Sequence, residues 1–211
     1  LMEDTPITLG MALMDFIPNL GYLVGAYFLV RLILRERGQR CGRMAMLGAL
    51  LVFLGGTLKA TSKLLDALNN RPYTVNVLSE AQFVMLAIGF LGTVTALILL
   101  ARERRPSTPL SAALLFIAPW KIPFLLVMTL CQFGALGLLT YLSFRRKIIL
   151  SGALFITSAV LTLLMAGMAS GSQVLGMQWI EQSINSLAQI SFAIAAFKLD
   201  RTSQQQKTAI C

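Results

Sequence analysis

The chain has 211 residues, of which 56% are hydrophobic and 13% are charged, and its formal net charge is +9. An average soluble domain is roughly 45–50% apolar and about 25% charged, so this composition excludes a soluble enzyme and a disordered scaffold. The mean hydropathy of +0.74 and the repeated apolar stretches of more than about 18 residues indicate that the lipid bilayer is the solvent. We therefore predict an all-α polytopic membrane protein that forms a single transmembrane domain over residues 1–211.

Several kinds of site are excluded by the residue types that the sequence lacks. It contains no histidine, which excludes His-ligated haem, the usual zinc sites and Ser-His or Cys-His nucleophile pairs. The three cysteines, Cys41, Cys131 and Cys211, are far apart in the sequence, so neither a metal-binding pair nor a structural disulfide is expected. We therefore expect no metal and no cofactor, and we do not favour an enzyme.

Six apolar runs are long enough to cross a bilayer as helices, because each reaches the core thickness of about 30 Å at about 1.5 Å per residue. Residues 1–7 carry acidic side chains rather than the basic ones that begin a signal peptide, so we expect the first run to remain in the mature protein. The predicted spans are 7–34, 44–68, 73–101, 123–144, 148–169 and 174–199.

The segment 106–120 is also apolar, but its helical part reaches only about 18–23 Å. The positive-inside rule favours a crossing here, because a crossing gathers 14 of the 18 basic residues on the inner side. We therefore predict seven transmembrane helices, with the N-terminus outside and the C-terminus inside. The basic residues on the inner side are Arg31, Arg35, Arg37, Arg40, Arg43, Arg102, Arg104, Arg105, Arg145, Arg146, Lys147, Lys198, Arg201 and Lys207.

The seven predicted helices divide into two units with the same orientation, in a 3+1+3 arrangement. Two short segments, one from each unit, are similar in sequence: EAQFVMLA, which begins at Glu80, and EQSINSLA, which begins at Glu181. Two parallel three-helix repeats of this kind enclose the site between them in some transporters. The predicted boundaries are 7–105 for the first unit, 106–120 for a short linker helix, 121–200 for the second unit and 201–211 for a disordered tail.

Polar residues within the predicted spans define the candidate site. An ionisable side chain costs roughly 2.5–3.5 kcal/mol at the centre of a membrane helix, so each requires a partner or a water-filled cavity. Along their helices, Asp15, Lys59, Glu80 and Glu181 all fall about 10–14 Å below the outer boundary. Polar side chains also recur on one face of the first and last helices. The candidate residues are Asp15, Asn19, Lys59, Glu80, Gln132, Gln178, Glu181, Asn185 and Gln189.

The polar layer favours an integral membrane carrier or binding protein for a small polar or cationic molecule. Its carboxylates are predicted to bind a proton or a cation, with Lys59 as their counter-charge. Two alternatives stay open: a non-catalytic membrane subunit or sensor with a structural polar network, and an intramembrane lipid-modifying enzyme that uses carboxylates. We expect the lipid bilayer as the environment, a prokaryotic inner membrane as the location and no nucleic acid as a partner.

Overall fold

The computed structural model describes residues 8–68, 72–101, 121–168 and 175–208. All regular secondary structure within these ranges is α-helix, which confirms the predicted all-α character for this part of the chain. The helices are α1 (Leu9–Met14), α2 (Phe16–Arg37), α3 (Gln39–Ala67), α4 (Pro72–Ala101), α5 (Lys121–Arg145), α6 (Ile149–Met168) and α7 (Leu175–Thr208).

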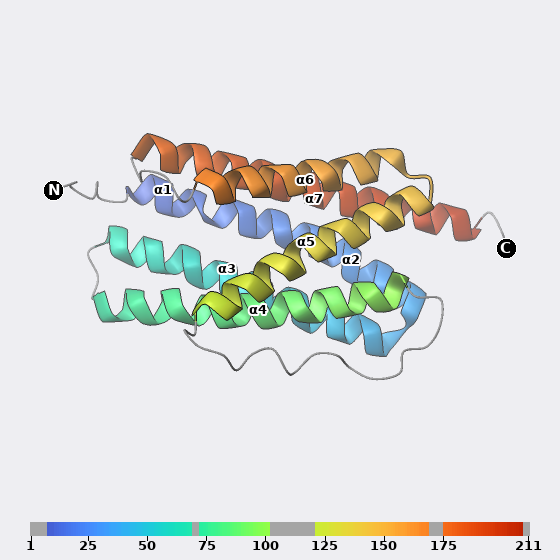
Figure 1. The fold of residues 1–211 in the computed structure, drawn as a ribbon, viewed down its shortest axis with the longest axis horizontal. Coiled ribbons are helices and arrows are strands. Elements are labelled where there is room, and N and C mark those ends of the chain that lie inside the picture. The colour runs from blue at the N-terminus through green and yellow to red at the C-terminus, as the bar shows by residue number, and fades with distance from the viewer. Residues whose placement is uncertain (1–7, 69–71, 102–120, 169–174, 209–211) are drawn as a thin grey trace.

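Four helical stretches within the described ranges are long and apolar enough to cross a membrane: Leu9–Arg37, Gln39–Ala67, Val77–Ala101 and Phe124–Arg145. The apolar part of α6 is shorter, and polar side chains interrupt α7, yet both helices run along the same bundle (Figure 1). Six of the seven predicted spans therefore correspond to helices. The seventh, 106–120, lies outside the described residues.

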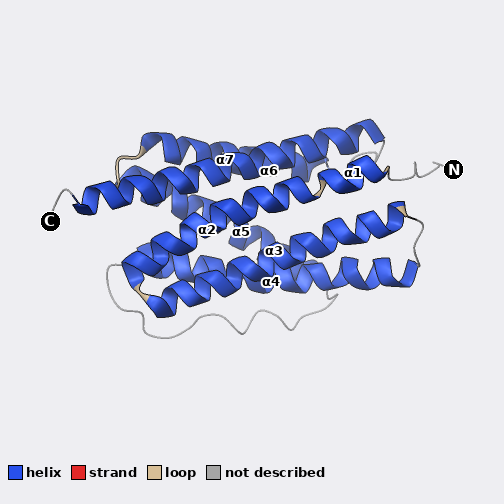
Figure 2. Cartoon of the chain, turned by 180° about the vertical axis from the view of Figure 1, so that it is seen from behind, coloured by secondary structure: helices blue, strands red, loops and turns tan. Residues whose placement is uncertain are grey.

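The long helices form a closed ring. Each packs against the next in the order α2, α3, α4, α5, α6 and α7, and α7 packs against α2. Figure 1 shows the α3–α4 pair and the α6–α7 pair as two layers, with α5 crossing between them, and Figure 2 shows α2 crossing on the opposite face. The chain follows α4 and α5 in the same direction, so Ala101 and Lys121 lie toward opposite ends of the bundle (Figure 1).

The first span is interrupted at Asp15, between α1 and α2 (Figure 2). Pro18 lies in the first turn of α2, and its nitrogen cannot donate a hydrogen bond to the carbonyl of Met14. The helix therefore breaks at Asp15, three residues before the proline. As a result, Asp15 lies at the interruption, where it is buried.

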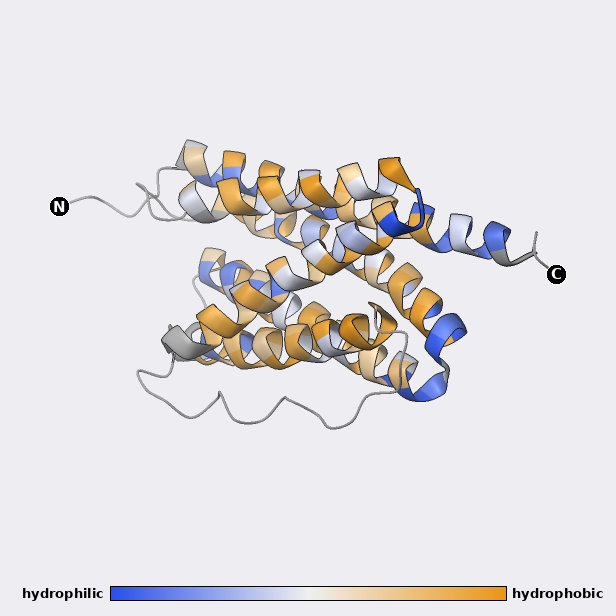
Figure 3. Ribbon diagram, turned by 45° about the vertical axis from the view of Figure 1, so that its right-hand side comes forward, coloured by the Kyte–Doolittle hydropathy of each residue, from blue (hydrophilic) through white to orange (hydrophobic). Residues whose placement is uncertain are grey.

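Three basic segments of the described chain converge at one end of the bundle: the α2–α3 turn, the α5–α6 turn and the end of α7. Gly38 joins α2 to α3 with a φ of 79°, a conformation that glycine adopts without steric cost. Side chains at this turn bond to residues near the ends of α4, α5 and α7, and Figure 3 shows the hydrophilic colouring that results. We call this the basic end and the opposite end the N-terminal end. The predicted gathering of basic residues is thus confirmed, except for 102–105, which lies outside the described residues.

α7 continues to Thr208, which corrects the prediction of a disordered tail from residue 201 onward. Two contacts hold the extension against the α5–α6 turn. The hydroxyl of Ser203 accepts a hydrogen bond from Arg146 at 2.6 Å, and Gln206 donates one to the Arg146 carbonyl at 3.4 Å. Polar composition alone predicted disorder because these tertiary partners are distant in the sequence.

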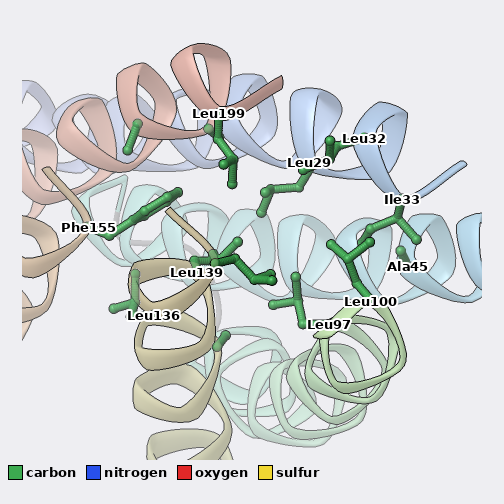
Figure 4. Packing of buried hydrophobic residues seen from close by; sticks show 14 of the residues in the cluster. Leu29, Leu32, Ile33, Ala45, Leu97, Leu100, Leu136, Leu139, Phe155 and Leu199 are labelled. Atoms are coloured by element: carbon green, nitrogen blue, oxygen red, sulfur yellow. The ribbon is translucent and has the colours of Figure 1, made fainter. Parts of the chain in front are cut away.

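The hydrophobic core fills the basic half of the ring (Figure 4). Leu32, Leu97 and Leu199, from three different helices, are fully buried in it. The closest backbone approach joins α3 and α4, where a Cβ added to Gly48 would lie 2.8 Å from the Gly89 carbonyl oxygen. Any larger residue at Gly48 would therefore push these two helices apart.

Candidate functional site

An ion pair between α3 and the break at Asp15 lies at the N-terminal end. Asp15 Oδ2 is 2.7 Å from Lys63 Nζ, and the aspartate side chain is only 5% exposed. Lys59, one turn earlier in α3, is exposed and interacts electrostatically with Asp15, Lys63 and Glu181. The direct partner of Asp15 is therefore Lys63, which the sequence analysis did not select.

Asn19 fixes α2 against α3 just below this ion pair. Its Nδ2 donates a hydrogen bond to the Asp15 carbonyl at 3.3 Å. Its Oδ1 occupies the position that a side chain at Gly56 would need. The glycine in α3 thus makes room for a polar side chain of α2, and this brings the predicted residues Asp15 and Asn19 to the same helix interface.

The polar stripe of α7 faces partly into the ring. Glu181, Asn185 and Gln189 are half-buried, as is Gln178. Gln182 and Ser186 each lie one residue after a member of this stripe and are more deeply buried, at 6% and 9% exposed. The sequence analysis missed both, although their i, i+4 spacing was the signal that could have found them.

α4 contributes a different polar residue from the one predicted. Glu80 is exposed, whereas Gln82, two residues later, is buried. A depth estimate along the helix axis cannot distinguish these positions, because two residues differ by about 3 Å in height but by about 200° around the axis. Gln82 is therefore the α4 side chain that the structure turns inward at this level.

Several buried side-chain atoms in the N-terminal half have no hydrogen-bond partner within the described residues. Leaving such an atom unpaired costs about 1–3 kcal/mol, and most buried polar atoms in proteins are bonded to protein or to water. This layer therefore provides hydrogen-bonding capacity for water or a polar ligand. The atoms are Asp15 Oδ1, Gln82 Oε1, Glu181 Oε1, Gln182 Oε1 and Ser186 Oγ; we call their residues, together with Lys63, the buried polar layer.

A cavity of about 50 Å³ lies near the middle of the ring, and α2, α3, α4, α5, α6 and α7 all line it. This volume holds about three water molecules. Gln132 and Gln189 are the two predicted residues in its wall. Tyr22, which the helical spacing places on the same face as Asp15 and Asn19, also lines the cavity. Isolated hydroxyls within apolar runs gave no sequence signal, so three polar lining residues were missed: Thr93, Ser158 and Thr162.

Aromatic rings shape this central cavity. Tyr22 stacks on Phe192, with ring centroids 5.9 Å apart and an interplanar angle of 5°, and meets Phe90 edge-on at 6.5 Å. The Tyr22 hydroxyl also shares a hydrogen bond with the Thr93 side chain. On the side of the basic end, Leu97 and other residues of the apolar core line the cavity, so hydrophobic packing separates it from that end.

The ionic groups that join α2 to α7 at the basic end are paired with one another. Arg35 Nη2 lies 2.8 Å from Asp200 Oδ1 and donates to the Asp200 carbonyl at 3.2 Å. Arg31 Nε is 3.8 Å from the other carboxylate oxygen, and the aspartate side chain is 4% exposed. With its amide oxygen turned toward the two arginines, Gln204 accepts hydrogen bonds from both. The sequence analysis assigned these residues to topology alone.

A second paired group joins α2 to the α5–α6 turn. Both Nη atoms of Arg146 contact the Glu36 carboxylate, at 2.7 and 2.6 Å. Nearby, the hydroxyls of Ser143 and Ser151 lie 3.2 Å apart, and Ser151 donates to the Ala195 carbonyl at 2.8 Å. These contacts link α5, α6 and α7, so the helices are bonded to one another at the basic end.

Among the described residues, no group of three or more Cys, Asp or Glu side chains could hold a metal ion. No family model matches the chain, and no curated protein or solved structure matches it either. The setting of the site, an all-helical bundle with several helices apolar enough to span a bilayer, is consistent with an integral membrane protein.

Proposed function

We propose that this protein is a membrane carrier or binding protein for a small polar or cationic molecule. The observation that carries the proposal is the set of buried, unpaired polar atoms in the N-terminal half, including Asp15 Oδ1 and Glu181 Oε1, beside a cavity that six helices line. A bundle that needed these groups only for stability would pair them, as the basic end pairs the carboxylates of Asp200 and Glu36. A solute that supplies hydrogen-bond donors satisfies them instead.

The chemistry of the layer favours a ligand that donates hydrogen bonds. Carboxylate oxygens only accept hydrogen bonds when they are ionised, and Asp15 and Glu181 each supply one such oxygen. Lys63 and Lys59 balance their charge, so the layer tolerates both a neutral polar ligand and a cation. Gln132 and Gln189 place two further amide groups in the wall of the central cavity.

The helix arrangement supports the proposed pair of three-helix repeats. The two units are α2–α4 and α5–α7, and equivalent helices have equivalent neighbours in the ring. For example, α2 packs against α3 as α5 packs against α6, and α4 packs against α5 as α7 packs against α2. The parallel course of α4 and α5 gives both units the same direction (Figure 1). The site then lies between the two units, where repeat-built transporters bind their substrates. We further propose that the basic end faces the cytoplasm of a prokaryotic cell, in keeping with the positive-inside rule.

The first test is the thermal stability of the purified protein against a panel of amines, sugars and nucleosides. A ligand that binds only the folded state adds about 2.7 kcal/mol of stability at a hundred times its dissociation constant. We expect one chemical class to stabilise the native protein and to lose this effect in Glu181→Gln. The matched control is Asp66→Asn, which removes an exposed carboxylate near the same end and should retain the response.

Two outcomes would contradict the proposal. If no solute stabilises the protein and Glu181→Gln only lowers its melting temperature, the layer is structural and the subunit alternative gains. If a solute stabilises the native protein and Glu181→Gln equally, the binding site lies elsewhere. A transport assay in vesicles then separates a carrier from a protein that only binds the solute.

A further inference from the structure

A second cavity opens on the outer surface of the ring, between α2 and α3. This groove encloses about 770 Å³, within the range of about 300–1,000 Å³ that is usual for ligand pockets. Its apolar wall includes Leu23 and Leu34 of α2 and Met46 and Leu50 of α3, each 38–44% exposed. In a membrane these side chains face the hydrocarbon, so lipid chains are the molecules that meet them.

Two arginines line the groove as well. Arg31 and Arg35 both belong to its wall, near the end of α2 where the basic residues gather. Asp200 neutralises one of the two positive charges, because Arg35 forms the 2.8 Å contact with it. The Arg31 side chain is 48% exposed, and its Nε lies 3.8 Å from the same carboxylate. This contact is longer than that of Arg35. A guanidinium carries five N–H donors, so Arg31 retains donors and a net positive charge for a further anion.

From this combination we infer that the α2–α3 groove is a binding site for a phospholipid with an anionic headgroup. One acyl chain lies along the leucine and methionine wall, and the headgroup phosphate accepts hydrogen bonds from Arg31. Basic pockets between membrane helices on the cytoplasmic side recognise anionic headgroups by the same chemistry. The inference is independent of the proposed function, since none of the residues of the buried polar layer lines this groove.

The groove and the central cavity share part of a wall. Ala26, Val30 and Ala49 line both of them, and two of these side chains are single methyl groups. A lipid in the groove therefore packs on the outer side of the thin wall whose inner side faces the cavity. A protein helix is a poorer occupant, because burying one here would bring a second apolar surface against the charged Arg31 without supplying an anion.

The test measures lipid binding to the full chain by native mass spectrometry in detergent. The probes are phosphatidylglycerol and phosphatidylcholine with identical acyl chains, each titrated against the native protein. We expect phosphatidylglycerol to bind more tightly, and Arg31→Gln to weaken its binding about fivefold, the usual effect of one basic residue at an anionic membrane surface. The matched control is Arg40→Gln, which removes an exposed arginine at the same end that does not line the groove.

A second pair of variants tests the acyl-chain part without disturbing any charge. Leu50→Trp fills the groove from a lipid-facing position, whereas Leu47→Trp enlarges a neighbouring exposed side chain of α3 outside it. We expect the first variant to lose phosphatidylglycerol binding and the second to retain it, with both melting within a few degrees of the native protein in detergent alone.

Four results would overturn the inference. The first is equal binding of the two lipids, and the second is an equal loss of binding in Arg31→Gln and Arg40→Gln. The third is a dimer of the chain that Leu50→Trp disrupts while lipid binding stays unchanged, because the groove would then be an interface between two copies. Inorganic phosphate is run alongside; if it displaces phosphatidylglycerol at millimolar concentration, the site recognises a free anion rather than a lipid.

Discussion

The two ends of the bundle differ in how their buried side-chain oxygen atoms are bonded. At the basic end, Asp200 of α7 is bonded to Arg35 of α2, and Glu36 of α2 is bonded to Arg146 of the α5–α6 turn. Ser151 of α6 donates a hydrogen bond to a carbonyl of α7. In the N-terminal half, Gln182 and Ser186 are equally buried but have side-chain atoms without partners among the described residues. A paired group stabilises the fold, whereas an unpaired one carries a cost that a ligand or water can remove. The contrast separates the structural end from the candidate binding end.

The largest expected effect comes from breaking the paired end at its most buried acid. Asp200→Asn leaves Arg35 without a counter-charge, which should lower the free energy of unfolding by about 3 kcal/mol and the melting temperature in detergent by about 6–12 °C. Asp66→Asn, at an exposed carboxylate in the other half, should change stability by less than about 0.5 kcal/mol. Equal effects of the two variants would show that the basic end is not a structural clamp.

Double-mutant cycles compare the two ends directly. Arg146 contacts Glu36 through two nitrogens, so the Glu36→Gln and Arg146→Gln cycle should give a coupling energy of about 2 kcal/mol. Asp15 and Lys63 share one contact, and the lysine side chain is 25% exposed, so their cycle should give about 1 kcal/mol or less. Thermal or chemical unfolding of the four proteins in each cycle provides the values. A stronger coupling at Asp15–Lys63 would reverse the assignment of the two ends.

Two serines give the sharpest comparison, because substitution by alanine should lower the free energy of unfolding at one position and leave it unchanged or raise it at the other. Ser151→Ala removes a hydroxyl that bonds Ser143 and the Ala195 carbonyl, and should cost about 1 kcal/mol. Ser186→Ala removes a buried hydroxyl oxygen without a partner among the described residues, and should be neutral or stabilise the empty protein by about 0.5–1 kcal/mol. Melting temperatures without ligand test this. A loss of more than about 1 kcal/mol in Ser186→Ala would mean that the layer is already satisfied.

The smallest expected effect concerns the α5–α6 turn at the basic end. Lys147 is exposed and has a φ of 61°, which costs a residue with a side chain roughly 1 kcal/mol or more relative to glycine. Lys147→Gly should therefore raise the free energy of unfolding by about 1 kcal/mol. Lys147→Ala removes the same charge but keeps the strained conformation, so it should bring no gain. If both variants behave alike, charge rather than backbone conformation determines the result.

The sequence alone determined which segments form helices and which of their ends lie together. Apolar runs between charged turns, as at Arg35–Arg43, predicted six helices that the structure contains, because a backbone in hydrocarbon must satisfy its hydrogen bonds internally. The distribution of arginine and lysine predicted the basic end. Pro18 accounts for the interruption that the structure has at Asp15. These are local properties, fixed by residues that are close together along the chain.

Only the tertiary structure decided which polar side chains meet. Depth along a helix predicted that Asp15 and Glu181 lie near one level. It could not predict the rotation of each helix, which selected Lys63 for the ion pair and Gln82 as the inward side chain of α4. Likewise, the partner of Glu36 lies 110 residues away in the sequence. Pairing depends on how six helices pack around a common axis, and that packing is set by side chains distributed over the whole chain, such as the glycines where α3 meets α4.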